Sequence, residues 1–304
     1  MSKFEVLVLG NSSAVPAYGR HPTSHLVNIH EHFLLIDCGE GTQERLSQYK
    51  CKPHKIQHIF ISHLHGDHYF GLFGLITSMN LSGRKDKLTI YSPAGVSELV
   101  AAISQLSNSV FNYEIDWKII KPNETQTLLD DNVKSVIAFP LNHRIPTFGF
   151  LVKEKPGKRI FKSDAFGENP LEYEIIRQLK DAKDYTYPDG TILKYEVYTS
   201  PPSFPRTYAF CSDTLYEPAV IPHIAKADLL YHEATYTELH KDKARENHHS
   251  TALDAARIAA MAEVKKLIIG HFSSRYKQLD HFTTEARGIF KNTQLAEEGT
   301  WYPV

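Results

Sequence analysis

The sequence predicts an α/β protein in which two facing mixed sheets carry helices on their outer sides. Short apolar runs alternate with helical patterns along the chain. The first half has the order β…βα and the second half shows the mirrored sense, as expected for two sheets covered by outer helices. Several predicted strands also end at a polar, metal-competent residue, and proteins with open sheets bind ligands at the carboxyl ends of their strands.

The first half of the chain begins with a strand at 4–9, followed by a loop of small residues at 10–16. Apolar runs of strand length predict further strands at 33–37, 56–61 and 88–91. Helices are expected after them at 40–48, about 69–79 and 96–106, the last with Pro93 near its start.

The second half repeats this alternation with shorter strands. Strands are predicted at 133–139, 147–152, 209–211, 229–232 and 267–269. An alanine-rich helix is expected over 251–262, opened by Ser250 and Thr251, which are residue types suited to an N-cap.

The segment 153–206 interrupts the pattern. It opens with a cluster of basic residues, Lys153, Lys155, Lys158, Arg159 and Lys162, and continues with a helical stretch at 171–180 and a Pro- and Gly-bearing tail. We therefore expect one domain over 1–304 with this segment as an inserted arm. The charge run is explained either by a solvated face or by contacts with substrate phosphates.

Composition limits the function classes. The chain has 304 residues, 42% hydrophobic and 23% charged, which is ordinary for a soluble globular protein with a substantial core. A formal net charge of -1 provides no global basic field, so a polyanionic substrate would need a local basic patch. The sequence has no run of 18 apolar residues, so we expect no membrane span. Three scattered cysteines and a start without a cleavable apolar region predict a cytoplasmic protein.

The segment His63-Leu64-His65-Gly66-Asp67-His68 follows the strand 56–61 directly. The strand supplies rigidity, and the loop lets its side chains converge on one point. Imidazole and carboxylate ligands suit zinc or a similar divalent metal, and no thiolate is present for a closed structural site. A solvated His-rich loop is the alternative, but four ligand-type side chains within six residues favour metal binding.

Three further candidates, His143, Asp213 and His271, each follow a predicted strand. Taken singly, each would be interpreted as an ordinary loop residue. Taken with the first motif, they supply the ligands that a two-metal site still needs, because strand ends meet at one edge of a sheet.

This set of residues resembles the metallo-β-lactamase superfamily and, within it, the ribonuclease Z family, which removes 3′ trailers from precursor transfer RNA. Residues 37–43 resemble the family's first motif, 63–68 its second, His143 its third, 212–214 its fourth and His271 its last ligand. The segments His232-Glu233-Ala234-Thr235 and His249-Ser250-Thr251 resemble the H-E-A-T and H-S-T segments of the family. These two are more specific than the metal motif.

The resemblance implies a four-layer αβ/βα metallo-β-lactamase sandwich, a homodimer, and two Zn²⁺ ions per chain. Mn²⁺ or Fe²⁺ would also suit ligands of this type. One ion would be held by His63, His65 and His143, and the other by Asp67, His68 and His271, with Asp213 bridging. Two such ions, about 3.5–4 Å apart, would supply a shared hydroxide as the nucleophile for the phosphodiester. Asp67 is also implied as a catalytic residue that orients the nucleophile or accepts its proton, and Asp37 is expected behind a ligand histidine.

His249 is expected to assist the departing 3′ oxygen, because a histidine that titrates near neutrality suits proton donation. Glu233 would fix its tautomer. Two alternatives stay open: the neighbouring His248 does this work, or His249 merely starts the following helix.

The leading hypothesis is a zinc-dependent endoribonuclease that cuts precursor tRNA and leaves a 3′-hydroxyl. A general phosphodiesterase acting on small or cyclic phosphodiesters is the main alternative, since the chain has Pro16-Ala17-Tyr18-Gly19-Arg20-His21 where the family often carries P-x-K-x-R-N. A metal-binding dimeric scaffold without catalysis is the third, and the intact ligand set argues against it. A β-lactamase or thioester hydrolase would not explain the H-E-A-T and H-S-T segments.

Overall fold

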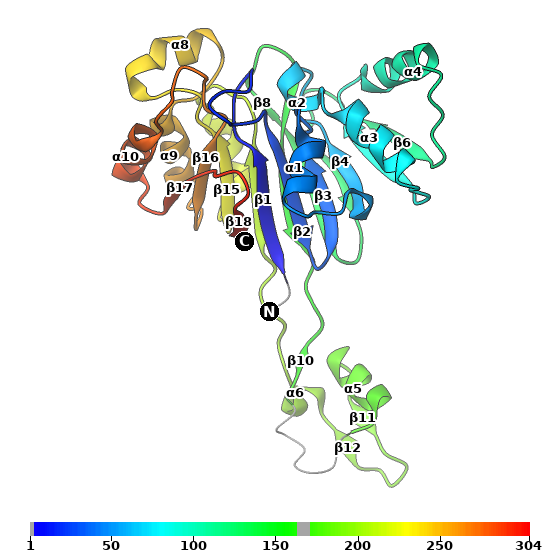
Figure 1. Ribbon diagram of the computed structural model, residues 1–304. Helices are drawn as coiled ribbons and strands as arrows, with labels where there is room; N and C mark the ends of the chain where they lie inside the picture. The colour runs from blue at the N-terminus through cyan, green and yellow to red at the C-terminus, as the bar shows by residue number, and fades with distance from the viewer. Residues whose placement is uncertain (1–2, 163–170) are drawn as a thin grey trace. The chain divides into compact units, whose positions relative to one another are not determined.

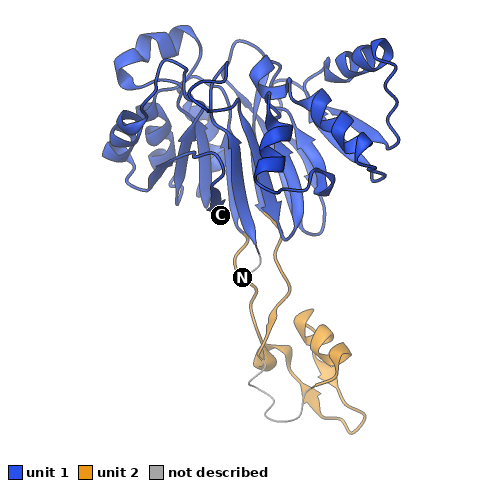
Figure 2. Ribbon diagram, in the orientation of Figure 1, with its two compact units in different colours: residues 1–153, 206–304 blue, residues 154–205 orange. Residues whose placement is uncertain are grey.

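The computed structural model describes residues 3–162 and 171–304 of the chain. Contacts divide it into a larger unit, residues 1–153 with 206–304, and a smaller unit, residues 154–205 (Figure 2). These boundaries lie close to the segment 153–206 expected to form an arm, of which residues 163–170 lie outside the described residues. That the smaller unit serves as an arm stays a prediction.

The larger unit contains two seven-stranded mixed sheets, which confirms the predicted fold class. The first sheet has the order β18-β1-β2-β3-β4-β5-β6, antiparallel from β18 to β3 and parallel from β3 to β6. Its strands are β1 (Phe4–Gly10), β2 (Ser24–Ile29), β3 (His32–Ile36), β4 (Ile56–Phe60), β5 (Leu88–Ser92), β6 (Ile115–Ile119) and β18 (Trp301–Pro303).

The second sheet has the order β17-β16-β15-β14-β9-β8-β7, parallel from β17 to β14 and antiparallel where β14 meets β9 and where β8 meets β7. Its strands are β7 (Gln126–Asp130), β8 (Lys134–Leu141), β9 (Thr147–Glu154), β14 (Thr207–Cys211), β15 (Leu229–Glu233), β16 (Leu267–Gly270) and β17 (Thr293–Leu295).

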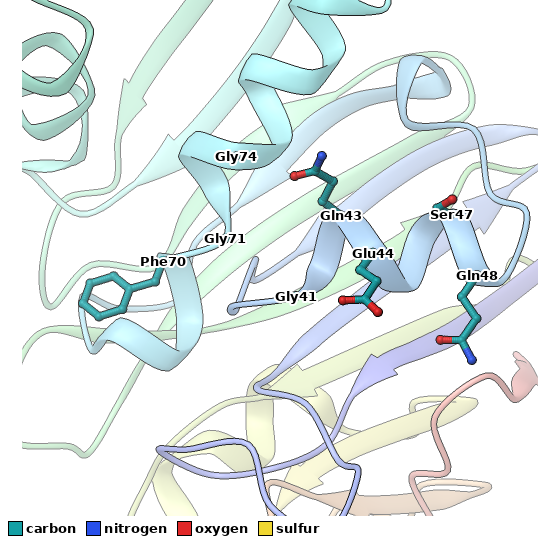
Figure 3. A pocket seen from close by; sticks show the side chains of 8 residues that line it. All are labelled: Gly41, Gln43, Glu44, Ser47, Gln48, Phe70, Gly71 and Gly74. Carbon is teal, nitrogen blue, oxygen red and sulfur yellow. The ribbon is translucent and has the colours of Figure 1, made fainter. Parts of the chain in front are cut away.

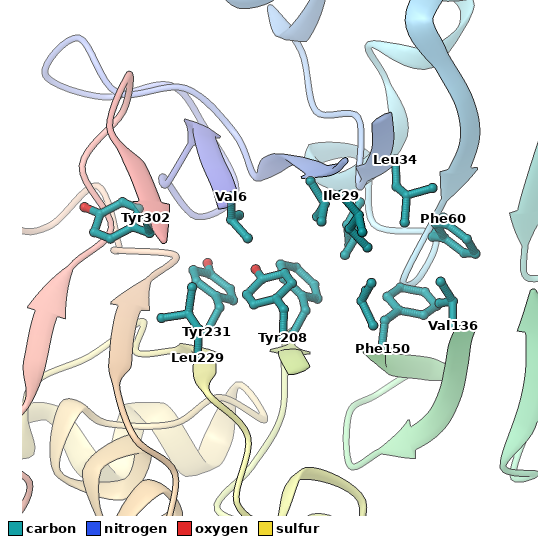
Figure 4. Packing of buried hydrophobic residues seen from close by; sticks show 14 of the residues in the cluster. Val6, Ile29, Leu34, Phe60, Val136, Phe150, Tyr208, Leu229, Tyr231 and Tyr302 are labelled. Atoms are coloured by element: carbon teal, nitrogen blue, oxygen red, sulfur yellow. The ribbon is translucent and has the colours of Figure 1, made fainter. Parts of the chain in front are cut away.

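The core lies between the inner faces of these sheets (Figure 4). Leu34 and Phe60 of the first sheet face Phe150, Tyr208 and Tyr231 of the second, and all five side chains are almost completely buried. Removal of this apolar surface from water is the main force that joins the two halves of the chain.

Helices cover the outer face of each sheet (Figure 1). Apolar residues of α1, α3 and α4 pack on the first sheet, and those of α9 and α10 on the second. The helices of the larger unit are α1 (Thr42–Gln48), α2 (Gly66–Tyr69), α3 (Leu72–Leu81), α4 (Val96–Leu106), α7 (Ile221–Ile224), α8 (Lys241–Glu246), α9 (Ala252–Met261) and α10 (Asp280–Ile289).

The smaller unit has a core of its own around Ile175, Leu179 and Leu193. It contains the strand pairs β10 (Ile160–Phe161) with β13 (Thr199–Ser200) and β11 (Tyr185–Thr186) with β12 (Ile192–Leu193), together with α5 (Tyr173–Lys180) and α6 (Tyr195–Tyr198). Part of its charge run has structural partners: Lys158 pairs with Asp181, and Arg159 donates to the Thr199 hydroxyl.

The prediction of one continuous helix at about 69–79 is wrong in one respect. The structure has two helices there, α2 and α3, with a break at Gly71. The Gly71 N–H donates to the Cys38 carbonyl at 2.9 Å, and a Cβ at this position would lie 2.1 Å from the Gly39 carbonyl oxygen. The chain therefore forms α2 and α3 around a close backbone contact that only glycine permits. Across the described ranges, no helix is both long and apolar enough to cross a membrane.

Candidate metal centre

The predicted ligands follow strands, most of them on loops, with Asp67 and His68 in the short helix α2. His63, His65, Asp67 and His68 come after β4, His143 after β8, Asp213 after β14 and His271 after β16. His63, His68, Asp213 and His271 are buried, although all of them are polar. Buried polar groups of this kind require partners, because water cannot reach them.

A first group consists of His63, His65, His143 and Asp213, whose ligand atoms all lie within 4.8 Å of one another. The His65 Nδ1 lies 3.0 Å from the His63 Nε2 and 3.3 Å from the His143 Nε2. One Asp213 oxygen, Oδ2, lies 3.6 Å from the His63 Nε2. Three imidazole nitrogens and a carboxylate oxygen thus converge on one point, as a cation requires.

A second group consists of Asp67, His68 and His271. The other Asp213 oxygen, Oδ1, lies 3.4 Å from the His68 Nε2 and 3.2 Å from the His271 Nε2. These three atoms are buried and have no hydrogen-bond partner. Leaving such atoms unpaired is costly, so their common direction fits a shared cation. Asp213 faces both groups, one oxygen to each.

The opposite nitrogens of three predicted ligand histidines are held by hydrogen bonds. The His68 Nδ1 donates to Asp37 at 2.7 Å, and the His143 Nδ1 donates to the His248 carbonyl at 2.7 Å. The His271 Nδ1 lies 2.8 Å from the Thr235 hydroxyl. Such contacts direct the Nε2 of each ring toward a metal and raise its basicity. Asp37 therefore lies behind a histidine, as expected.

The charges of the site favour a cation. Burial lowers the pKa of His143 to about 4 and that of His63 well below its usual value, so both rings are neutral and able to ligate. Burial opposes charge on His68 as well, but Asp67, Asp213 and Asp37 outweigh it and raise the pKa of His68 well above the ordinary value. The same carboxylates would attract a metal ion.

A buried carboxylate–histidine pair lies beside the second group. The Glu233 Oε1 accepts a hydrogen bond from the His249 Nδ1 at 2.9 Å, and also from the Ser250 N–H at 3.0 Å. Burial opposes the charge on His249, but Glu233 and Asp213 outweigh it and raise the pKa of His249. The ring is therefore suited to carry a proton.

Thr235 joins this pair to the predicted ligands. Its hydroxyl lies 2.9 Å from the Glu233 Oε2 and 2.8 Å from the His271 Nδ1. Donating to the carboxylate leaves the hydroxyl oxygen free to accept from the imidazole. We did not predict this contact, and the only signal for it was the position of Thr235 within the H-E-A-T segment.

His248 and His249 have different places. His249 lines the same cavity as the predicted ligands His65, Asp67 and His271, and His248 is absent from its lining. His248 instead has a positive φ of 56°, which directs its carbonyl to His143. The following helix, α9, is capped by the Thr251 side chain, so its start does not require His249.

The cavity over the candidate metal centre has a volume of about 450 Å³. Four predicted ligands line it, His65, Asp67, Asp213 and His271, together with residues 13–16, Pro22, Glu40, Gly66, Phe70, Arg144 and His249. The loop after β1 reaches Asp67 directly, since the Ala14 N–H donates to its carboxylate at 2.8 Å. Arg144 was not predicted, although its position next to His143 could have indicated it.

The loop at 16–21, which departs from the family pattern, is anchored to the body of the larger unit. The His21 N–H donates to Glu298 at 2.6 Å, and the Arg20 guanidinium donates to the Tyr276 carbonyl at 2.7 Å. A separate groove of about 690 Å³ lies between α1 and α3, with Gln43, Glu44 and Gln48 along one side (Figure 3). Its lining includes none of the predicted ligands.

Two facing mixed sheets with a His/Asp cluster at their strand ends define a metallo-β-lactamase-fold enzyme. The chain belongs to the ribonuclease Z family, and it is a hydrolytic nuclease. It is 42% identical to the ribonuclease Z of Bacteroides thetaiotaomicron over 98% of this chain and 94% of the relative. It is 43% identical to that of Phocaeicola vulgatus over 98% of this chain and 96% of the relative.

A solved structure and a family model also match the chain. The crystal structure of the short form of human tRNase Z superimposes with a TM-score of 0.71 at 28% identity, covering 99% of each chain. Residues 4–165 match the family model described as "Anti-Pycsar protein Apyc1", so this part of the chain also belongs to that family.

Proposed function

We propose that the protein is an endoribonuclease that removes the 3′ trailer from precursor tRNA and leaves a 3′-hydroxyl on the tRNA. The observation that carries the proposal is the arrangement around Asp213, whose two oxygens face two groups of ligand side chains beside the Glu233–His249 pair. The similarity to ribonuclease Z relatives extends over nearly the whole chain, which supports precursor tRNA as the substrate.

The donor set fits two zinc ions, since it offers only nitrogen and oxygen ligands and several of these are buried and unpartnered. His63, His65 and His143 would hold one ion, Asp67, His68 and His271 the other, with Asp213 shared. Bound zinc would supply Lewis acidity toward the phosphate and a water activated near neutral pH.

The chain's own groups perform the proton transfers. Asp67, fixed by the Ala14 N–H, orients the attacking water and accepts its proton. As the new phosphorus–oxygen bond forms, the bond from phosphorus to the 3′ oxygen breaks, and His249 donates its proton to that oxygen. Glu233 holds the His249 Nδ1, which leaves the other nitrogen of this cavity-lining ring for proton donation. The trailer leaves with the 5′ phosphate.

Three further expectations belong to this proposal. The enzyme acts in the cytoplasm, it is a homodimer, and basic residues of 153–206 contact RNA phosphates. The dimer rests on the family resemblance, and light scattering of the purified protein tests it directly.

The first experiment uses zinc-loaded protein with a precursor tRNA that carries a 3′ trailer, and bis(p-nitrophenyl) phosphate as a small diester. Trailer removal at one site, lowered roughly 10²–10⁴-fold by His249→Ala with metal content unchanged, is the expected result. Turnover of the small diester with the RNA left intact would replace the proposal with a general phosphodiesterase.

A further inference from the structure

A second recess lies beside the cavity of the candidate metal centre. It has a volume of about 490 Å³, and its lining residues are Leu64, His65, Pro93, Ala94, Ile119, Ile120, Pro122, Ile145 and Pro146. His65 is the single polar side chain among them. An apolar recess of this size has the dimensions of a small-molecule site and not of a surface irregularity.

The walls come from four separate parts of the larger unit. They are the loop after β4, the loop after β5, the end of β6 with the residues after it, and the segment before β9. Three of the lining residues are prolines, which restrict the backbone. A recess with such walls is largely formed before a ligand arrives, so that little ordering is needed on binding.

The recess adjoins the cavity of the candidate metal centre, and two features mark their boundary. His65 lines both spaces. The segment 143–146 separates them: His143 belongs to the first ligand group, Arg144 lines the metal cavity, and Ile145 and Pro146 line the recess. Four consecutive residues therefore contribute to the ligand cluster, to the metal cavity and to the recess.

Arg144 indicates which chemical group binds between the metal cavity and the recess. Its side chain is exposed, and it makes no hydrogen bond or ion pair with the residues that the structure describes. A guanidinium with free donors next to a predicted metal ligand suits a phosphate group. In RNA, each such phosphate is linked to a nucleoside, and the base of the nucleoside has two apolar faces.

We propose that the apolar recess binds the base of a nucleotide adjacent to the cleaved phosphodiester. This assignment rests on the proposed nuclease function and adds to it a subsite for substrate. Because the side chains of the walls offer almost no hydrogen-bonding groups, the base is held by apolar contact with its faces. The edges of the base form no sequence-specific hydrogen bonds there. Base contacts of this kind tolerate any sequence and still contribute to affinity.

The test combines a change in the substrate with a change in the recess. Precursor tRNAs carry an abasic nucleotide immediately before or immediately after the cleavage site, and each is compared with the intact precursor. The enzyme variant is Ile119→Asp, since the Ile119 side chain is 58% exposed and can be replaced without opening the core. Leu106→Asp is the matched control, because Leu106 is 85% exposed on α4 and does not line the recess.

With the wild-type protein, removal of the base on one side of the cleavage site should lower kcat/KM about tenfold. Ile119→Asp should lower kcat/KM for the intact precursor to a similar extent, and base removal should then have little further effect. Leu106→Asp should retain the full sensitivity to base removal. A variant that is only misfolded or less stable would lose activity but would keep its sensitivity to base removal. Loss of that sensitivity therefore shows that the base and the Ile119 side chain interact.

Two outcomes would overturn the assignment while leaving the nuclease function in place: equal cleavage of both abasic precursors and the intact one, or an undiminished effect of base removal in Ile119→Asp. Failure of the wild-type protein to cleave the intact precursor is a distinct result, and it would overturn the proposed function together with this subsite.

Discussion

At the scale of single residues, the candidate site depends on the groups that hold the predicted ligands in place as well as on the predicted ligands themselves. Asp37, Thr235 and the His248 carbonyl each hold the Nδ1 of a ring whose Nε2 points into the cluster. His248 adopts a left-handed backbone conformation in doing so. Conformations of this kind are costly for non-glycine residues and persist where the surrounding structure enforces them.

Replacing Thr235 by valine tests this arrangement. Thr235→Val keeps the side-chain shape but removes the hydroxyl between His271 and Glu233. We expect zinc affinity, measured by competition with a chelator, to fall roughly 10–100-fold. Thr237→Val is the matched control, since the Thr237 hydroxyl contacts Tyr276. Equal zinc affinity in both variants would show that Thr235 does not support a ligand.

The charge of Glu233 should appear in the pH dependence of catalysis. Burial lowers the pKa of His249, but Glu233 and other carboxylates outweigh it, so that the pKa is raised. If His249 donates a proton, activity is lost as the pH rises through that raised pKa. Glu233→Gln removes the negative charge and lowers the pKa of His249, so the alkaline limb of kcat should move to lower pH.

The measurement is a kcat–pH profile for precursor cleavage by the wild-type protein, Glu233→Gln and Glu44→Gln. Glu44 is exposed on α1 and serves as the charge-matched control. An alkaline limb at the same pH in all three proteins would exclude His249 as the proton donor.

At the scale of elements, strand ends and one helix break position the site. Gly71 separates α2, which carries Asp67 and His68, from α3, and its close approach to Gly39 ties this region to the loop after β3. The position of two predicted ligands therefore depends on a backbone contact rather than on helix propensity.

Gly71→Ala should destabilise the protein by about 1–3 kcal/mol, because the added Cβ has no space beside the Gly39 carbonyl. Gly288→Ala in α10 is the matched control, since nothing lies within 4 Å of a Cβ there. The control should be neutral or stabilising by about 0.5–1 kcal/mol. Denaturant unfolding of both variants measures the difference, and similar free energies of unfolding would contradict the steric argument.

At the scale of the whole molecule, the larger unit contains both sheets, the candidate metal centre and the apolar recess. The smaller unit leaves it between two neighbouring strands, because Lys153 of β9 pairs with Thr207 of β14. Neighbouring strands lie about 4.8 Å apart, so a short linker can close the larger unit after removal of the smaller one.

Replacement of residues 154–205 by a short Gly-Ser linker should leave metal binding and turnover of a small diester intact. Affinity for precursor tRNA should fall, and its dependence on salt should become less steep, because phosphate contacts release bound counterions. Binding measured at several salt concentrations tests this. An unchanged salt slope would mean that the basic residues of this segment form a solvated face.

Local patterns in the sequence were sufficient for the fold class, the strands that end at the site and the set of ligand-type residues. A strand followed by a His-rich loop is visible within a dozen residues, since strand period and ligand chemistry are local properties. The strand β2 was missed because its buried positions include Ser24, His25 and Asn28, which interrupt the apolar run.

Only the tertiary structure decided which side chains meet across long separations in the chain. Arg144 beside the cluster, Thr235 between Glu233 and His271, and a recess whose walls span residues 64–146 depend on the register and order of the strands. The physical reason is that a sequence specifies the chemistry and period of each segment, whereas the packing of the two sheets sets the distances between segments.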